Sequence, residues 1–128
     1  MVTSPQEVAL AEVRKAIGMF REMHVHILGL VENMSTFCRG HANERIELFG
    51  AGGGETLSRE TALPLPAAIP LDIELRKGGD VGLPIVVGHP ESETSRVFRE
   101  MARKIMAFPS TLGRMSEPST VICRTSGT

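Results

Sequence analysis

The sequence contains no tryptophan and no tyrosine, and its 128 residues include only two cysteines, Cys38 and Cys123. Cysteines so far apart do not form the framework of a disulfide-rich secreted domain, which favours a reducing environment. No apolar run approaches the roughly 20 residues that cross a bilayer. Residues 1–7 also lack the basic and apolar regions of a secretory signal. We therefore expect a cytoplasmic protein with no membrane partner.

An excess of charge of either sign is also missing. The 14 basic and 15 acidic residues are interspersed and give a formal net charge of -1. Without a cationic surface, we expect no nucleic-acid partner bound through its phosphates. A hydrophobic content of 41% and a mean hydropathy of +0.01 are globular values. The length suits one domain or a piece of a larger one.

The clearest structural signal is the start of a helix. Ser4-Pro5-Gln6-Glu7 combines a capping hydroxyl, a proline suited to the first helical position and a glutamate that completes a capping box. The apolar residues that follow recur with the period of an amphipathic helix, at Ala9, Val13, Ala16, Ile17 and Phe20. This pattern predicts a helix over residues 5–22, after an extended segment at 1–3. A chain that begins so close to a helix is expected to be truncated.

Short apolar runs and helical patterns alternate along the rest of the chain. Buried strands are predicted at residues 25–31, 63–69 and 84–87, with a loop at 36–49. Helical segments are predicted at residues 55–60, 72–77 and 92–108. This alternation predicts an α/β fold with a mostly parallel sheet and flanking helices. The last residues, 109–128, are rich in Ser, Thr, Pro and Gly and are predicted to form a disordered tail.

Two segments are candidates for ligand binding. The glycine-rich residues 50–54 precede a predicted helix, so they form either an anion-binding helix N-terminus or a turn that needs glycine. The P-loop pattern G-x-x-x-x-G-K-S/T is absent from the sequence. Asn33 follows a predicted strand at its carboxyl end, where open α/β sheets bind ligands. Its carboxamide suits either adenine, which needs one donor and one acceptor, or a turn after the strand.

Cys38-Arg39-Gly40-His41 has the spacing C-x-x-H. A thiolate and an imidazole at this spacing can share one metal ion, which would need two further ligands or a second copy of the chain. The alternative is that Cys38 and His41 have purely structural roles. The residues alone leave both interpretations open.

Several segments in unbroken order, over about residues 2 to 107, are similar to one known family. They are Ser4-Pro5-Gln6-Glu7-Val8-Ala9-Leu10, Ile27-Leu28-Gly29-Leu30-Val31-Glu32-Asn33-Met34-Ser35, Phe49-Gly50-Ala51-Gly52-Gly53-Gly54-Glu55, Ile69-Pro70-Leu71-Asp72, Arg76 to Val87, and His89-Pro90-Glu91-Ser92. They resemble the Mrp/ApbC family, MinD-like P-loop ATPases that carry iron–sulfur clusters to apo-proteins. The resemblance implies a partial Rossmann-like P-loop NTPase fold, in which residues 1–108 match the C-terminal half of the ATPase domain.

The resemblance also implies a nucleotide site and a function. In the family, the residue that matches Asn33 helps to hold the adenine of ATP, and the segment with Pro70 and Asp72 lies beside it. The P-loop of the family lies before the position that matches Met1, so no catalytic residue is expected in this chain. The implied function is that of an ATP-binding iron–sulfur cluster carrier. The alternative is a non-catalytic interaction module, or a relic, that pairs with a partner chain carrying the P-loop.

The iron–sulfur cluster is implied less directly. Family members usually carry C-x-x-C in this region, and a homodimer holds one bridging cluster between two such pairs. Aligned without a gap, the two cysteine positions fall on Arg39 and Ala42. A slip of one residue would place Cys38 and His41 at the ligand positions, and imidazole can replace thiolate on such centres. Apo iron–sulfur proteins would be the clients.

Overall fold

The computed structural model describes residues 1–39 and 44–108. The elements, in chain order, are β1 (Val2–Thr3), α1 (Glu7–Glu22), β2 (Val31–Arg39), β3 (Glu44–Ile46), α2 (Gly53–Thr61), β4 (Ala67–Leu71), α3 (Ile73–Val81), α4 (Ile85–Gly88) and α5 (Glu93–Ala107). The predicted tail and His41 lie outside the described residues. The helix predicted at residues 5–22 and the extended segment before it are confirmed, as are the α/β class and the mostly parallel sheet.

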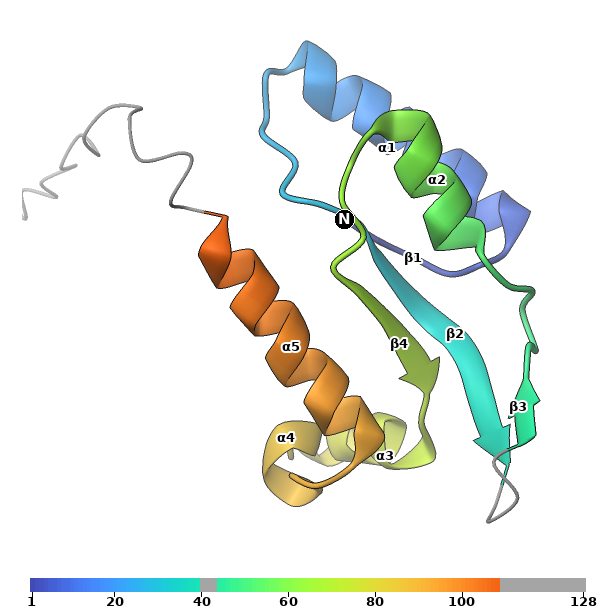
Figure 1. Ribbon diagram of the computed structural model, residues 1–128, viewed down its shortest axis with the longest axis vertical. Coiled ribbons are helices and arrows are strands. Elements are labelled where there is room, and N and C mark those ends of the chain that lie inside the picture. The colour runs from blue at the N-terminus through green and yellow to red at the C-terminus, as the bar shows by residue number, and fades with distance from the viewer. Residues whose placement is uncertain (40–43, 109–128) are drawn as a thin grey trace, which may run out of the picture.

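The four-stranded sheet is built around β2 (Figure 1). The beginning of β2 pairs in parallel with β1 on one side and with β4 on the other. Further along, β2 pairs with β3 in the antiparallel direction, so this strand connects both parts of the sheet. The ladder between β2 and β4 shifts register between Asn33 and Phe37.

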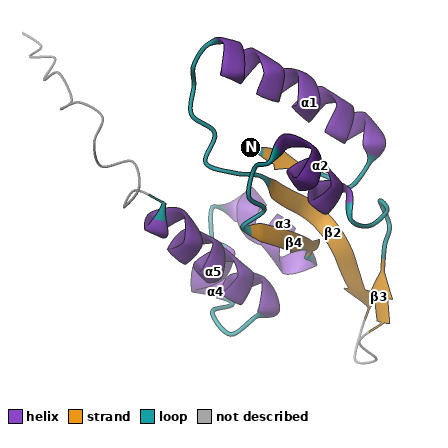
Figure 2. Cartoon of the chain, turned by 45° about the horizontal axis from the view of Figure 1, so that its top comes forward, coloured by secondary structure: helices purple, strands orange, loops and turns teal. Residues whose placement is uncertain are grey.

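Helices cover both faces of the sheet (Figure 2). On the face covered by α1 and α2, the core consists of four buried side chains: Leu10, Ile17, Leu30 and Leu57. On the opposite face, Val31, Ala67 and Ile69 are buried against side chains of α3 and α5. At about 25 cal/mol per Å² of apolar surface removed from water, these two small cores supply most of the driving force for folding. No helix in the described part of the chain is long and apolar enough to cross a membrane.

The strand predicted at residues 25–31 is wrong in position, because β2 begins only at Val31. The neighbouring segment contains Pro64 and Pro66, which have no N–H to donate to a ladder. The N–H of Leu30 still donates to the carbonyl of Pro64 at 2.8 Å, and regular pairing starts one residue later. The strand predicted at 63–69 begins late, at Ala67, for the same reason.

The loop predicted at residues 36–49 is also wrong, because β2 continues to Arg39 and pairs with β3. The strand predicted at 84–87 is instead the single helical turn α4. The carbonyl of Pro84 accepts the N–H groups of Val87 and Gly88, at 2.9 and 3.0 Å. Only Ile85 of this turn is buried. Because α4 packs against α5, this side chain is removed from solvent without a neighbouring strand.

The capping box predicted at Ser4 does not form. The helix α1 begins at Glu7, with Gln6 as its N-cap residue and no side-chain capping bond. Ser4 is buried in the turn between β1 and α1, where its carbonyl accepts the hydroxyl of Thr3 at 3.0 Å. Ser4 and Pro5 therefore belong to the turn before the helix and not to the helix itself.

Candidate functional site

Asn33 is the third residue of β2, so it lies inside the strand and not after it as the sequence predicts, just before the register shift in the ladder with β4. Its backbone pairs with Ile69 of β4, which places Pro70 one residue further along the neighbouring strand. The Oδ1 atom of Asn33 accepts the N–H of Met34 at 3.0 Å. Met34 has a φ of 58°, in the left-handed region, and the ladder loses its register at this point. The structure thus brings Asn33 and Pro70 close together on two adjacent strands, at the register shift in their ladder.

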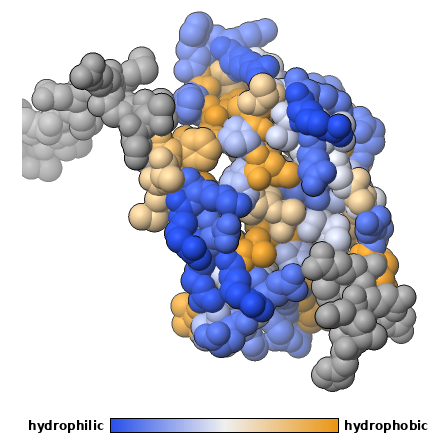
Figure 3. Space-filling model, viewed as in Figure 1, coloured by the Kyte–Doolittle hydropathy of each residue, from blue (hydrophilic) through white to orange (hydrophobic). Residues whose placement is uncertain are grey.

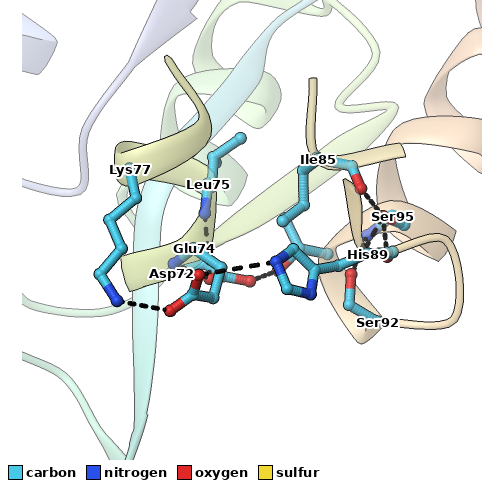
Figure 4. A network of polar contacts seen from close by, with 9 residues as sticks. Asp72, Glu74, Leu75, Lys77, Ile85, His89, Ser92 and Ser95 are labelled. Carbon is cyan, nitrogen blue, oxygen red and sulfur yellow. Dashed lines mark hydrogen bonds and ion pairs between the residues drawn. The ribbon is translucent and has the colours of Figure 1, made fainter. Parts of the chain in front are cut away.

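Asp72 is the N-cap residue of α3 (Figure 4). Its Oδ1 accepts the N–H groups of Glu74 and Leu75, at 2.8 and 3.2 Å, and its Oδ2 accepts the hydroxyl of Thr94 at 2.5 Å. Burial opposes ionisation of this carboxyl, but the hydrogen bonds from Thr94 and the two amides, together with nearby His89, lower its pKa. Asp72 therefore joins α3 to α5 in its ionised form.

The same network continues to His89, which the sequence places in a loop. The Nε2 atom of His89 lies 3.5 Å from a carboxylate oxygen of Glu74 (Figure 4). Glu74 also accepts a hydrogen bond from Lys77 at 2.9 Å, which is the main reason that its pKa is lowered. Fully buried Ser95 donates its hydroxyl to the carbonyls of Ile85 and His89. These contacts hold α3, α4 and α5 together next to the Pro70–Asp72 segment.

The glycine-rich loop before α2 is occupied by a side chain of the protein itself. The N–H of Gly54 donates to Oε2 of Glu32 at 2.5 Å, and Glu32 is only 5% exposed. A carboxylate at this position complements the partial positive charge of a helix N-terminus. Gly50 and Gly52 have φ values of 89° and 70°, as the turn interpretation requires. The geometry therefore favours the turn interpretation over an anion-binding site, because the Glu32 carboxylate already accepts the N–H of Gly54.

A cleft of about 220 Å³ lies beside these residues. It is lined from β2 by Glu32, Ser35 and Thr36, from the glycine-rich loop, from β4 by Ala68 and Pro70, and from α5. Of the three residues predicted to bind the nucleotide, Pro70 alone lines this cleft. Sequence reasoning did not single out Glu32, Ser35 or Thr94. Glu32 lies one residue before Asn33 and Ser35 two residues after it, while Thr94 lies 22 residues after Asp72. These spacings form no periodic pattern that a sequence analysis could detect.

The candidate metal ligands cannot be placed as a pair. The backbone of Cys38 lies in β2 opposite Arg45 of β3, and His41 lies outside the described residues. Within residues 1–39 and 44–108, no group of three or more His, Cys, Asp or Glu side chains could hold a metal ion. The ligand roles of Cys38 and His41 stay predictions.

Comparison with known proteins places this geometry among P-loop NTPases. The model of the ParA family described as NUBPL iron-transfer P-loop NTPase matches residues 1–106. The chain is 46% identical over 106 residues to the iron-sulfur cluster carrier protein of Synechocystis sp., and 41% identical over 106 residues to the mitochondrial iron-sulfur protein required for NADH dehydrogenase of Arabidopsis thaliana. These matches cover 82% and 83% of this chain, but 30% and 34% of the two relatives.

Solved structures give the same fold. The cell division ATPase MinD of Pyrococcus furiosus matches with a TM-score of 0.63 at 27% identity, over 83% of this chain and 40% of that one. The nucleotide-binding protein of Archaeoglobus fulgidus, solved in complex with ADP, matches with a TM-score of 0.57 at 35% identity, over 73% of this chain and 38% of that one. The chain thus spans about a third of its curated relatives and about two fifths of these structures.

Proposed function

Because the chain belongs to the NUBPL iron-transfer P-loop NTPase family, we propose that it supplies the base-binding end of the ATP site in an iron–sulfur cluster carrier. The observation that carries this proposal is the pairing of Asn33 with Ile69, which puts a carboxamide and Pro70 close together on two parallel strands, where their ladder shifts register. Ligands of open α/β sheets bind at the carboxyl ends of the strands, and Pro70 is the residue before the last one of β4. The proposal makes Asn33, Pro70 and Asp72 parts of one site, with different roles.

Asn33 is the residue proposed to contact the base directly. Its Oδ1 already accepts one hydrogen bond from Met34, and a carbonyl oxygen can accept a second. Its Nδ2 can donate to a ring nitrogen of adenine while Oδ1 accepts from the exocyclic amino group. Pro70, whose ring is apolar, would contact the face of the base. Asp72 holds the segment through α3 and Thr94, so its contribution is to the position of Pro70.

This chain is expected to bind adenine weakly and not to hydrolyse ATP. The sequence contains no P-loop pattern, so the chain offers no recognisable cradle for the phosphates. The phosphate groups of a bound nucleotide would find no P-loop within residues 1–128. Phosphate release by the purified chain that depends on magnesium and disappears on changing Asn33 would contradict this expectation.

Saturation-transfer NMR with ATP tests the base contact directly. We expect the adenine protons H2 and H8 to receive more saturation than the ribose protons, and Asn33→Ala to abolish the effect. Asn33→Asp is the matched variant, because it keeps the size and the acceptor but removes the Nδ2 donor. Equal saturation of base and ribose, or transfer that survives Asn33→Ala, would refute the proposed site.

We also propose that Cys38 and His41 contribute to binding the cluster as cargo, in a dimer of this chain or with a partner. Anaerobic reconstitution with iron and sulfide, followed by iron analysis and visible absorption, tests this proposal. Iron that is retained by the unsubstituted chain and lost in both Cys38→Ser and His41→Ala would support it. Retention of the same iron by both variants would contradict it, and so would no bound iron at all.

A second candidate function, that of an interaction module, is favoured by one surface. A cleft of about 280 Å³ is lined by Met1, Phe20 and residues 25–28, and the side chains of Val25 and Leu28 are 45% and 43% exposed. It lies next to β1, which pairs only with β2 in the described part of the chain. Figure 3 shows apolar side chains exposed in a band between hydrophilic surfaces. Exposed apolar surface beside an open strand edge is typical of a protein interface.

The partner expected on this surface is a chain of the same family that carries a P-loop. Co-expression with such a chain should give a stable complex that Leu28→Ser weakens, as measured by size-exclusion chromatography with light scattering. Val81→Ser is a suitable control, because Val81 is 77% exposed on α3, away from this cleft. A complex weakened equally by both variants, or no complex, would contradict the interaction module.

A further inference from the structure

Two buried polar side chains flank Asn33 and Met34. Glu32, which is 5% exposed, precedes the pair, and Ser35, which is 8% exposed, follows it. Burying such groups is costly unless each finds a partner. Glu32 accepts the N–H of Gly54 at 2.5 Å, and Ser35 donates its hydroxyl to the carbonyl of Ile69 at 3.1 Å. The pair between them is therefore tied to α2 on one side and to β4 on the other.

The backbone between these two anchors is held in an uncommon conformation. Met34 has a φ of 58°, in the left-handed region that residues with a side chain rarely adopt. The ladder between β2 and β4 shifts register after Asn33, so regular strand pairing does not hold this irregular part of β2, the Asn33–Met34 turn, in place. The bond from the N–H of Met34 to Oδ1 of Asn33 links the turn to the carboxamide. Whatever holds the turn therefore also sets the orientation of this side chain.

The side chain of Glu32 lies against Gly54, which has no side chain of its own. A Cβ atom at position 54 would lie 2.9 Å from Oε2 and 3.0 Å from Cβ of Glu32. The absence of a side chain at Gly54 thus lets the carboxylate reach the first turn of α2. On the other side, the carbonyl that receives the hydroxyl of Ser35 belongs to the residue just before Pro70. The Asn33–Met34 turn is therefore connected both to α2 and to the residue that precedes Pro70.

We propose that Glu32 and Ser35 are positioning residues, which hold the Asn33 carboxamide in the orientation that receives an adenine base. The inference rests on the proposed function, because it takes Asn33 as the base contact. It assigns a role to each member of the Glu32-Asn33-Met34-Ser35 segment. Glu32 anchors the turn to α2, Asn33 presents the carboxamide, Met34 provides the left-handed turn, and Ser35 anchors it to β4.

Four variants test the proposal in pairs. Glu32→Gln keeps the size but removes the charge, and Ser35→Ala removes the hydroxyl. Their controls are Glu55→Gln, which removes an exposed charge from the same turn of α2, and Ser58→Ala, which removes a hydroxyl that donates to the carbonyl of Leu63 at 2.6 Å. A net hydrogen bond of about 1 kcal/mol corresponds to roughly a fivefold change in affinity. We expect the first pair to weaken ATP binding by at least that factor, with Ser35→Thr restoring it.

Base discrimination and a ligand-free measurement separate positioning from a general loss of stability. The ratio of ATP to GTP affinity should fall in Glu32→Gln and Ser35→Ala and stay constant in the controls. Without ligand, the side-chain amide signals of Asn33 in a ¹H–¹⁵N spectrum should shift or broaden in the same two variants only. Unchanged discrimination and unchanged amide signals would overturn the positioning role. If the unsubstituted chain does not bind ATP, the proposed function fails, and the amide signals alone decide whether Glu32 and Ser35 orient Asn33.

Discussion

Gly78 and Gly79 are neighbours in α3, yet a methyl group at each should have opposite effects on stability. Gly78 is buried, and a Cβ atom built on it would collide with the carbonyl oxygen of Leu83. Gly79 is exposed, and a Cβ atom there meets nothing within 4 Å. The chain returns tightly at this point, because the N–H of Leu83 donates to the carbonyl of Gly78 at 2.8 Å. The two substitutions lie in the same helix and differ in the space available to the new methyl group.

The expected magnitudes follow from these surroundings. Replacing a helical glycine by alanine gains roughly 0.5–1 kcal/mol when the new methyl group is unhindered, so Gly79→Ala should stabilise the protein by that amount. Gly78→Ala gains the same helix propensity but forces the Leu83 carbonyl to move. Overpacking of this kind costs typically 1–3 kcal/mol, and it also weakens the hydrogen bond to Leu83. The two variants should therefore differ by about 2 kcal/mol.

Urea unfolding followed by circular dichroism at the helix band measures this difference. Tryptophan and tyrosine fluorescence are not an option in this chain, which has neither residue. With a slope of roughly 1–3 kcal/mol per M for a small protein, the two midpoints should lie about 1 M apart. Equal midpoints, or a higher midpoint for Gly78→Ala, would refute the close approach between α3 and the segment that follows it.

Three further changes test other parts of the structure. In α1, Gly18→Ala has open space around the new methyl group and should raise the free energy of unfolding by about 0.5–1 kcal/mol in the same urea assay. Because the folded-state pKa of Asp72 is lowered, its ionised carboxylate contributes stability that is present above the ordinary pKa and is lost as the pH falls through the lower one. Asp72→Asn should thus be less stable than the unsubstituted protein near pH 7 and approach it near pH 3. A constant gap between the two proteins would contradict this role. Ser95→Ala leaves the carbonyls of Ile85 and His89 without their shared donor and should cost about 1–3 kcal/mol. It should lower the thermal midpoint by several degrees, and an unchanged midpoint would show that the buried hydroxyl contributes nothing.

Local patterns in the sequence are sufficient to predict an element that buries only one of its faces. The period of apolar residues predicts α1 almost to its ends, because an amphipathic helix needs only one buried stripe. The strand boundaries were missed because they depend on the neighbouring strand. Pro64 and Pro66 delay the ladder of β2 although they lie more than 30 residues away from Leu30 along the chain. Pairing partners of this kind are not encoded in a local period.

The family, the α/β class and Asn33 as a candidate contact can all be predicted from the sequence, because these predictions depend on residue types in a fixed order. The surroundings of Asn33 depend on how the chain packs in three dimensions. The partner of Glu32 is 22 residues further along the chain, and the partner of Ser35 is 34 residues away. A hydrogen bond requires two atoms to meet within about 3 Å. Which polar groups meet in this way is decided by the packing of α2 and β4 against β2, and not by their order in the chain.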